Sequence, residues 1–255
     1  MEIVILTALG VGGATVLGAG IGFLFRRMSH RFSDIVLAFA AGVMLAAAVL
    51  GLVIPAVEHG TATFGTPLAL LMTVGGLFAG ALALSLMDKL VPHLHKLAGT
   101  EDEPHRNGKG SRVLLFVCAI AIHNLPEGIA AGVGFGGGNT AEALVIAGGI
   151  ALQNIPEGMV IIAPMLAAGI KPGRTFLIAL GTGLFEVVGT LIGYAAVSVS
   201  AAILPFALAF AGGTMLYVIS DEMIPETHAH SHQRGATYAL LLGFAVMLIT
   251  DVLLG

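Results

Sequence analysis

The hydrophobic positions of this chain form long, uninterrupted runs rather than an alternating pattern. Each run has about 20 or more mainly apolar residues, the length that a helix needs to cross the hydrocarbon core of a bilayer. The runs cover residues 3–25, 34–56, 68–90, 112–135, 142–169, 173–197, 203–223 and 235–254. We therefore expect an all-α integral membrane protein with eight transmembrane helices in a single domain, residues 1–255.

The composition agrees with a membrane environment. Hydrophobic residues make up 57% of the chain and charged residues 10%, whereas about 25% are charged in an ordinary soluble domain. The first run is followed by Arg26 and Arg27 and lacks a basic lead-in, so it is predicted to be a retained span rather than a signal peptide. The single cysteine, Cys118, excludes an intrachain disulfide. Nothing in the charge pattern indicates a nucleic-acid surface.

The basic residues predict how the chain is oriented. If the spans alternate in direction, all 11 lysine and arginine residues lie on one side of the membrane. They flank the connections after the first, third, fifth and seventh runs, including the polar loop 91–111. The positive-inside rule assigns these connections to the cytoplasm. We therefore expect a multi-pass protein of the cell (inner) membrane with both termini outside.

The sequence also contains an internal repeat. LAFAAGVML at 37–45 returns as LAFAGGTML at 208–216, and IPAVEH at 54–59 is echoed by IPETH at 224–228. The two copies lie in helices that are predicted to run in opposite directions. This pattern predicts an inverted repeat of the first three and last three helices around a central fourth and fifth helix, an arrangement that places transporter substrates near the midplane.

Two short polar motifs interrupt the runs 112–135 and 142–169 near their midpoints. They read HNLPEG from residue 123 and QNIPEG from residue 153. Each proline has no N–H to donate to the carbonyl four residues earlier, so we expect a kink and a freed carbonyl in each helix. His123 and Glu127 are four residues apart and share one helix face. The motifs therefore predict a polar site at membrane depth.

The two motif glutamates are predicted to need a cation. Glu127 and Glu157 both lie near mid-membrane, where an ionised carboxylate on a lone helix costs on the order of 3 kcal/mol. Neighbouring helices are antiparallel, so the carboxylates can meet at similar depth, and a divalent metal ion between them would relieve their repulsion. A lone histidine or amide in such a helix more commonly packs or joins helices, but the duplicated motif favours a metal site.

The paired motifs resemble the signatures of the ZIP family of divalent-metal transporters, in its bacterial GufA-like branch, and the resemblance covers almost the whole chain. It implies a binuclear metal site in which both motif glutamates bridge. The residues that match the ligands of one centre are Met44, His123, Glu127, Gln153 and Glu157. Those that match the second are Asn124, Asn154 and Glu186.

The resemblance also implies a mechanism. The first, fourth, fifth and sixth helices are expected to carry metal past a scaffold of the other four, as an elevator, commonly within a homodimer. Many relatives have histidine where this chain has Gln153, and an amide oxygen is a harder, weaker ligand than imidazole. The family resemblance implies Zn²⁺ as the main substrate. The weaker ligand at Gln153 favours looser metal selection, so we expect that Fe²⁺, Mn²⁺ or Cd²⁺ is also accepted.

Other polar residues are candidates for the transport path. Asp221 and Glu222 lie near the predicted cytoplasmic end of the run 203–223, whereas Glu58, His59 and Asp251 lie near outer helix ends. Ordinary solvation at an interface is the alternative explanation for each. Histidines also occur in two predicted cytoplasmic loops, where they either bind metal transiently or lie on a solvated surface: His93, His95, His105, His228, His230 and His232.

Together these observations predict a transporter that takes a divalent transition metal into the cytoplasm without covalent chemistry, with no cofactor beyond the transported ion. Two alternatives stay open. Channel-like passive conduction is one, since selectivity filters also use buried acids. An intramembrane metalloenzyme is the other, although the chain has no HExxH motif.

Overall fold

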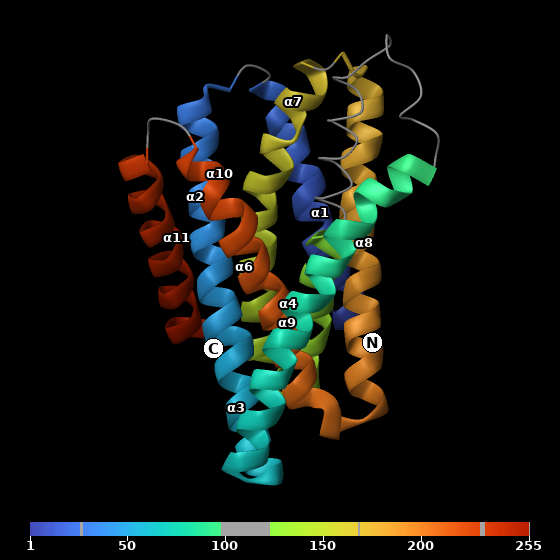
Figure 1. Ribbon diagram of the computed structural model, residues 1–255, viewed down its shortest axis with the longest axis vertical. Helices are drawn as coiled ribbons and strands as arrows, with labels where there is room; N and C mark the ends of the chain where they lie inside the picture. The colour runs from blue at the N-terminus through green and yellow to red at the C-terminus, as the bar shows by residue number, and fades with distance from the viewer. Residues whose placement is uncertain (26–27, 98–122, 168, 230–232, 255) are drawn as a thin grey trace.

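The computed structural model describes residues 1–25, 28–97, 123–167, 169–229 and 233–254. This part of the chain is a bundle of long helices and contains no β-strand (Figure 1). Seven helical segments within it are long and apolar enough to cross a membrane. The predicted class, an all-α membrane protein, is confirmed.

Most spans are formed by one continuous helix. These are α1 (Glu2–Leu24), α4 (Thr66–Leu97), α6 (Thr140–Val160), α8 (Pro172–Val199) and α11 (Gln233–Leu254). A short helix, α7 (Ile162–Ala167), follows α6 after a break at Ile161. Pro164 explains that break, because it cannot donate to the carbonyl of Val160, the last residue of α6.

Two spans are composite and have the same internal plan. The first consists of α2 (His30–Ala46), the π-helix η1 (Ala47–Val53) and α3 (Ile54–Phe64). The second consists of the 3₁₀ turn η3 (Ala201–Ile203), α9 (Leu204–Val218), the π-helix η4 (Ile219–Met223) and α10 (Ile224–His228). Both π-helices lie between the repeated segments that the sequence analysis identified.

The prolines after each π-helix account for its wider turn. Pro55 and Pro225 lie in the first turn of α3 and of α10, so neither can complete the α-helical bond to the residue four positions earlier. The preceding N–H groups instead reach back five residues, from Ile54 to the carbonyl of Val49 and from Ile224 to that of Ile219.

The fourth predicted helix is described only in part. Residues 123–133 are helical and continue into the 3₁₀ turn η2 (Gly134–Gly137), whereas residues 112–122 lie outside the described residues. The count of eight transmembrane helices therefore stays a prediction.

Three helices extend beyond the predicted apolar runs. The second span continues past 56 to Phe64, and the seventh continues past 223 to His228. The helix that begins at Thr66 extends to Leu97, so residues 91–97 of the predicted loop are helical. The fifth predicted run, 142–169, corresponds to the span Thr140–Ala167, which consists of α6 and α7. In the first three cases polar residues ended the apolar run before the helix ended, because helices project beyond the apolar layer.

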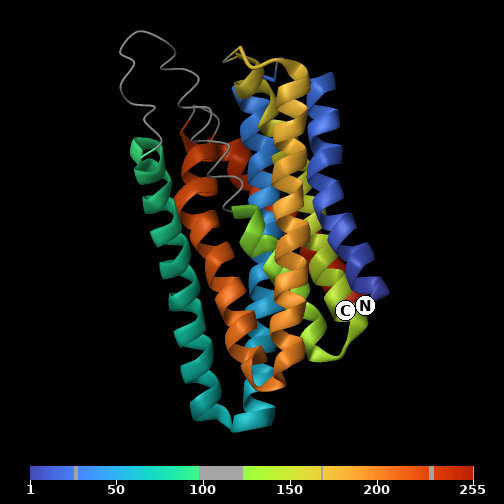
Figure 2. The ribbon, with the colours of Figure 1, turned by 90° about the vertical axis from the view of Figure 1, so that its right-hand side faces the viewer.

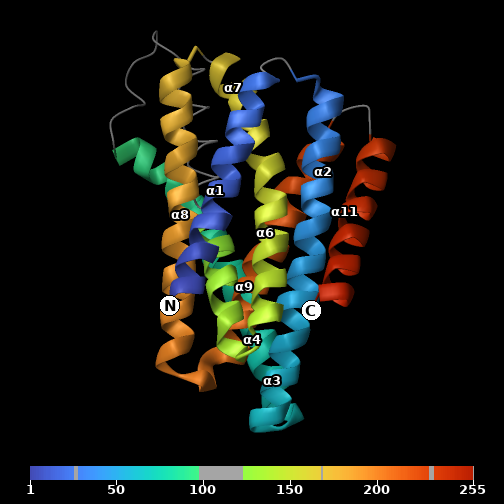
Figure 3. The same ribbon diagram turned by 180° about the vertical axis from the view of Figure 1, so that it is seen from behind.

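The chain alternates in direction, and its connections gather at the two ends of the bundle. In Figures 1 and 2 the α1–α2 and α7–α8 connections and the C-terminal end of α4 lie at the upper end. The α3–α4 and α8–α9 connections lie at the lower end, and both termini are nearer that end (Figure 3). Arg31, Lys171 and Arg174 flank the upper connections.

Close contacts between glycines and the backbone of neighbouring helices define two groups of helices. The first helix group consists of α1, residues 123–137, α6 and α8; the second consists of α2–α3, α4, α9–α10 and α11. Within the first, Gly158 lies against the carbonyl oxygen of Thr15, and Gly132 against that of Thr190. Within the second, Gly42 lies against the carbonyl oxygen of Leu240. A Cβ atom at any of these glycines would overlap backbone.

The contacts between the two groups are of a different kind. Ile146 of α6 packs on Gly51 of η1, and Met247 of α11 packs on Gly149 of α6. These glycines face side chains of the opposite group rather than its backbone. Each group is therefore tightly packed internally, whereas the boundary between the groups consists of side-chain contacts at these positions.

Candidate metal site

Glu186 lies at the centre of a buried, hydrogen-bonded cluster formed by four helices. Its Oε1 accepts hydrogen bonds from Thr15 Oγ1 of α1 at 2.5 Å and from Asn124 Nδ2 at 2.6 Å. Its Oε2 accepts a hydrogen bond from Asn154 Nδ2 of α6 at 2.5 Å. The four side chains are no more than 1% exposed. The structure thus brings together the three residues matched to the second metal centre, with Glu186 hydrogen-bonded to both asparagines.

The Glu186 carboxylate also determines how the two amides are oriented. A carboxylate accepts hydrogen bonds, so the NH₂ group of each asparagine must face it and the amide oxygen must point elsewhere. The Oδ1 atoms of Asn124 and Asn154 are buried and have no hydrogen-bond partner among the described residues. Two unpaired, oriented carbonyl dipoles are therefore available to a cation.

Glu127 and Gln153 are two further buried polar side chains near this cluster. Glu127 is 1% exposed and Gln153 is 0% exposed. By distance and angle, neither carboxylate oxygen of Glu127 and neither amide atom of Gln153 makes a hydrogen bond within the described part of the chain, although the Gln153 amide is close enough to the Glu127 carboxylate to stabilise its charge. Glu157 and Glu186 are close enough to repel the Glu127 carboxylate. A single amide compensates only part of the charge of a buried carboxylate, which is unfavourable unless a positive charge neutralises it, so Glu127 is well suited to bind a cation.

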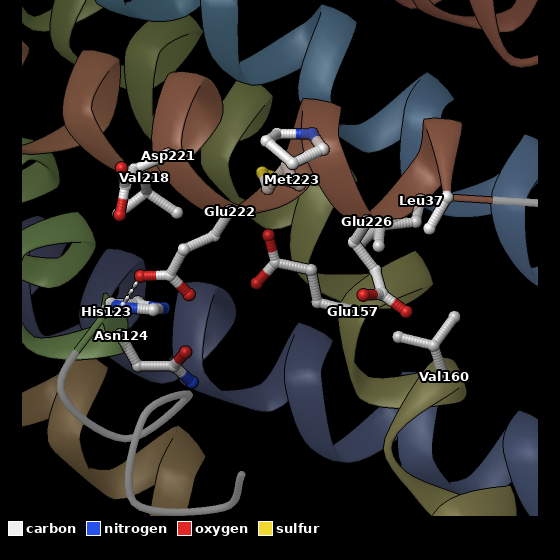
Figure 4. A pocket seen from close by; sticks show the side chains of 12 residues that line it. Leu37, His123, Asn124, Glu157, Val160, Val218, Asp221, Glu222, Met223 and Glu226 are labelled. Carbon is white, nitrogen blue, oxygen red and sulfur yellow. Dashed lines mark ion pairs between the residues drawn. The ribbon is translucent and has the colours of Figure 1, made fainter. Parts of the chain in front are cut away.

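A cavity of about 600 Å³ borders this region, and its lining includes Val160 at the end of α6 and Ala229 just after α10. Both helices end towards the upper end of the bundle in Figure 1. The polar residues that line it are His123, Asn124, Glu157, Asp221, Glu222 and Glu226. Figure 4 shows the Glu157 side chain extending towards that of Glu222, whose carboxylate is turned towards His123. The cavity therefore connects residues of both motifs with the acidic segment of η4 and α10.

Glu222 lies deeper than its predicted position on the exit path suggests. Its Oε1 is 2.8 Å from Nε2 of His123 (Figure 4), so it contacts a predicted metal ligand directly. Asp221 and Glu226 are exposed and lie at the cavity wall. Sequence reasoning missed Glu226, although the Ile-Pro segment carries an acid in both copies of the repeat.

A second cavity, of about 510 Å³, contains the residues predicted for the outer entrance. Glu58, His59 and Asp251 line it, together with Gly51 and Ile146. Glu142 also lines it and was missed by the sequence analysis. At the start of α6, Asn139 Nδ2 donates to Glu142 Oε1 at 2.6 Å. From the sequence alone, Glu142 is therefore explained as part of an ordinary helix N-cap. The two cavities share no lining residue.

Met44 is placed differently from the other predicted ligands. It is fully buried in the apolar core of α2 and lines neither cavity. Within the described residues, no three His, Cys, Asp or Glu side chains converge closely enough to hold a metal ion. The polar cluster is instead a mixture of acids and amides, with His123 turned towards Glu222.

Of the loop histidines, His228 has a structural position. Its Nδ1 is 2.9 Å from the carbonyl oxygen of Ile224, and its Nε2 is 3.2 Å from Oγ1 of Thr237, which links α10 to α11. His93 and His95 fall within α4. His105, His230 and His232 lie outside the described residues.

Comparison with known proteins identifies relatives over most of the chain. The family model described as ZIP Zinc transporter matches residues 95–251. The chain is 45% identical over 206 residues to the zinc transporter GufA of Myxococcus xanthus, which covers 80% of each chain. It is 39% identical over 243 residues to the zinc transporter ZIPB of Bordetella bronchiseptica, covering 95% of this chain and 78% of that one. The zinc transporter ZupT of Chlorobium chlorochromatii is 33% identical over 255 residues, 96% of this chain and 95% of that one.

Proposed function

Because this chain belongs to the ZIP zinc transporter family, we propose that it carries divalent transition metal ions, Zn²⁺ foremost, through the membrane into the cytoplasm. As a member of that family it is a membrane metal transporter and not an enzyme. The observation that carries the proposal is the Glu127 carboxylate, which is 1% exposed and close enough to the carboxylates of Glu157 and Glu186 to be repelled by them.

The proposed site holds two ions, with Glu127 and Glu157 bridging them. His123, Gln153 and Met44 complete one centre, and Asn124, Asn154 and Glu186 complete the other. The unpaired amide oxygens of Asn124 and Asn154 support this arrangement, because the Glu186 hydrogen bonds orient them before an ion arrives. Met44 has to reach the site from the core of α2, which makes it the least supported ligand.

Release follows from the position of Glu222. Its carboxylate and a bound ion compete for the same imidazole nitrogen of His123. When Glu222 takes the imidazole, the first centre loses its nitrogen ligand, and the ion faces the acidic wall formed with Asp221 and Glu226. Imidazole nitrogen suits Zn²⁺ and Fe²⁺, and the oxygen donors that remain also suit Mn²⁺. Cd²⁺ is the other ion that we propose is accepted.

The positions of the two cavities indicate the direction of transport. The cavity that contains His123 and Glu157 lies towards the end with the basic connections, which the positive-inside rule assigns to the cytoplasm. The structure would then represent an inward-facing arrangement, with both termini outside. The opposite cavity, with Glu58, His59, Glu142 and Asp251, is the proposed entrance. Separate cavities favour a carrier over a continuous pore.

An elevator motion is supported by the packing of the two helix groups. Backbone contacts through glycine hold each group together, whereas Ile146 and Met247 contact the opposite group through side chains. Side-chain contacts can be exchanged for others at a different level of the boundary. The proposed inverted repeat agrees with this division, since α2 packs on α11 as α9 packs on α4, and since both repeats contain a π-helix before an Ile-Pro step.

Metal uptake by proteoliposomes tests the proposal. We expect wild-type vesicles to take up Zn²⁺ saturably, and Glu127→Gln to reduce uptake at least tenfold, because it removes a bridging charge and leaves the volume unchanged. Glu2→Gln, at the exposed start of α1, is the matched control and should transport normally. Normal saturable uptake by Glu127→Gln would refute the site.

A further inference from the structure

We infer that Thr15 of α1 is a positioning residue of the metal site: its hydroxyl holds the Glu186 carboxylate in the orientation from which Asn124 and Asn154 present their oxygens to the ion. This inference rests on the proposed function and adds a residue from a helix that carries no predicted ligand. Between Glu2 and Leu24, the polar side chains of α1 are Glu2 at its start and two threonines, Thr7 and Thr15.

The packing of α1 explains how so short a side chain reaches Glu186. The carbonyl oxygen of Thr15 lies against Gly158 of α6, and Gly12 lies against the carbonyl oxygen of Gly183 of α8. Both contacts require glycine, because a Cβ atom at either position would overlap backbone. Since α1 is this close to both neighbours, Thr15 Oγ1 comes within 2.5 Å of Glu186 Oε1.

The hydrogen bond of Thr15 differs from those of other buried threonines. Thr182, Thr190 and Thr214 each donate to a carbonyl of their own helix, which is the usual behaviour of threonine within a helix. Thr15 instead donates to a side chain on a different helix. It is 1% exposed, so water cannot substitute for the acceptor or for the donor.

The consequence for the site follows from how the Glu186 oxygens are shared. Oε1 accepts from Thr15 and Asn124, and Oε2 accepts from Asn154. If the Thr15 hydroxyl is removed, one of the bonds that fix the carboxylate plane is lost, and the two amides are no longer held with their oxygens free. Groups that orient metal ligands in this way commonly change affinity by about 10- to 100-fold.

The experiment compares Thr15→Val, which keeps the shape and removes the donor, with Thr15→Ser, which keeps the donor. We expect Thr15→Val to weaken Zn²⁺ binding in calorimetry by about tenfold or more, and to raise the KM of proteoliposome uptake by a similar factor with kcat changed less. Thr15→Ser should remain within threefold of wild type. Thr182→Val, a buried threonine on α8 whose bond stays within its own helix, should change neither quantity.

Separate outcomes distinguish this inference from the proposed function. If wild-type protein neither binds nor transports Zn²⁺, the proposed function fails. If wild type transports and Thr15→Val keeps a wild-type KM and affinity, or if Thr15→Ser is as impaired as Thr15→Val, the role of Thr15 is refuted. Thr15→Cys serves in place of Thr15→Val if the latter does not fold, and the weak thiol donor should again raise KM.

Discussion

At Gln153 the proposed site has an amide where many relatives have the imidazole of a histidine. An imidazole nitrogen is a stronger ligand for Zn²⁺ than an amide oxygen, whereas Mn²⁺ gains less from the change. We therefore expect Gln153→His to increase the ratio of Zn²⁺ to Mn²⁺ uptake by about tenfold, the effect of roughly 1.4 kcal/mol of additional ligand strength. Competition flux in proteoliposomes measures this ratio directly.

The other glutamine of the chain offers a matched control. Gln233, at the start of α11, is exposed and donates to the carbonyl oxygen of His228, so Gln233→His adds an imidazole away from both cavities. It should leave the ratio unchanged. An unchanged ratio in Gln153→His as well would mean that this side chain does not contact the transported ion.

At this scale the sequence predicted the residues that stand out against an apolar background and missed those that do not. His123, Asn154 and Glu186 were found because polar side chains are rare in such runs. Thr15 was missed because threonine is common in membrane helices and usually bonds within its own helix. The proposed role of Thr15 depends on the packing of α8 beside α1, and the sequence of neither helix alone predicts that contact.

At the scale of single elements, the glycines at the α1–α6 crossing are predicted to determine both stability and site geometry. A Cβ atom at Gly158 would overlap the carbonyl oxygen of Thr15, so α1 would have to move away from α6. We expect Gly158→Ala to destabilise the protein by about 1–3 kcal/mol and to reduce Zn²⁺ affinity, because the same movement withdraws Thr15 from Glu186. Thermal melting in detergent and calorimetry measure the two effects.

The same helix contains a glycine with open space around it. A Cβ atom at Gly148 of α6 would have no neighbouring atom within 4 Å, and Gly148→Ala should be neutral or slightly stabilising because alanine favours the helix. Equal melting temperatures for the two variants would contradict the close crossing. From the sequence alone the two glycines are equivalent, since both lie in one apolar helix.

Element boundaries illustrate why hydropathy alone predicts spans incompletely. The predicted run ended at 56 because Glu58 and His59 follow. The helix α3 nevertheless continues to Phe64, and these two side chains line the second cavity. The π-helices were not predicted, although their cause, the prolines at 55 and 225, is visible in the sequence. A proline indicates that a bond is lost, but only packing determines whether the helix kinks, ends or widens.

For the molecule as a whole, the proposed elevator makes a prediction about cross-linking between the two helix groups. A Cβ atom at Gly149 of α6 would lie 3.6 Å from the Cβ of Ala47 in η1, a separation that a disulfide can span once the flexible end of the Met247 side chain, which lies against Gly149, moves aside. With Cys118 replaced by alanine, we expect oxidised Ala47→Cys/Gly149→Cys protein to lose transport and to regain it on reduction, because the bond fixes the first group against the second.

A cross-link within the first helix group is the corresponding control. A Cβ atom at Gly134 would lie 3.8 Å from the Cβ of Ala143, so Gly134→Cys/Ala143→Cys can form a similar bond without joining the groups. Its transport should be the same oxidised and reduced. If the Ala47→Cys/Gly149→Cys protein still transports when fully cross-linked, the two groups do not move past one another. The metal would then have to pass between the cavities through rearrangement of side chains around Glu127 alone.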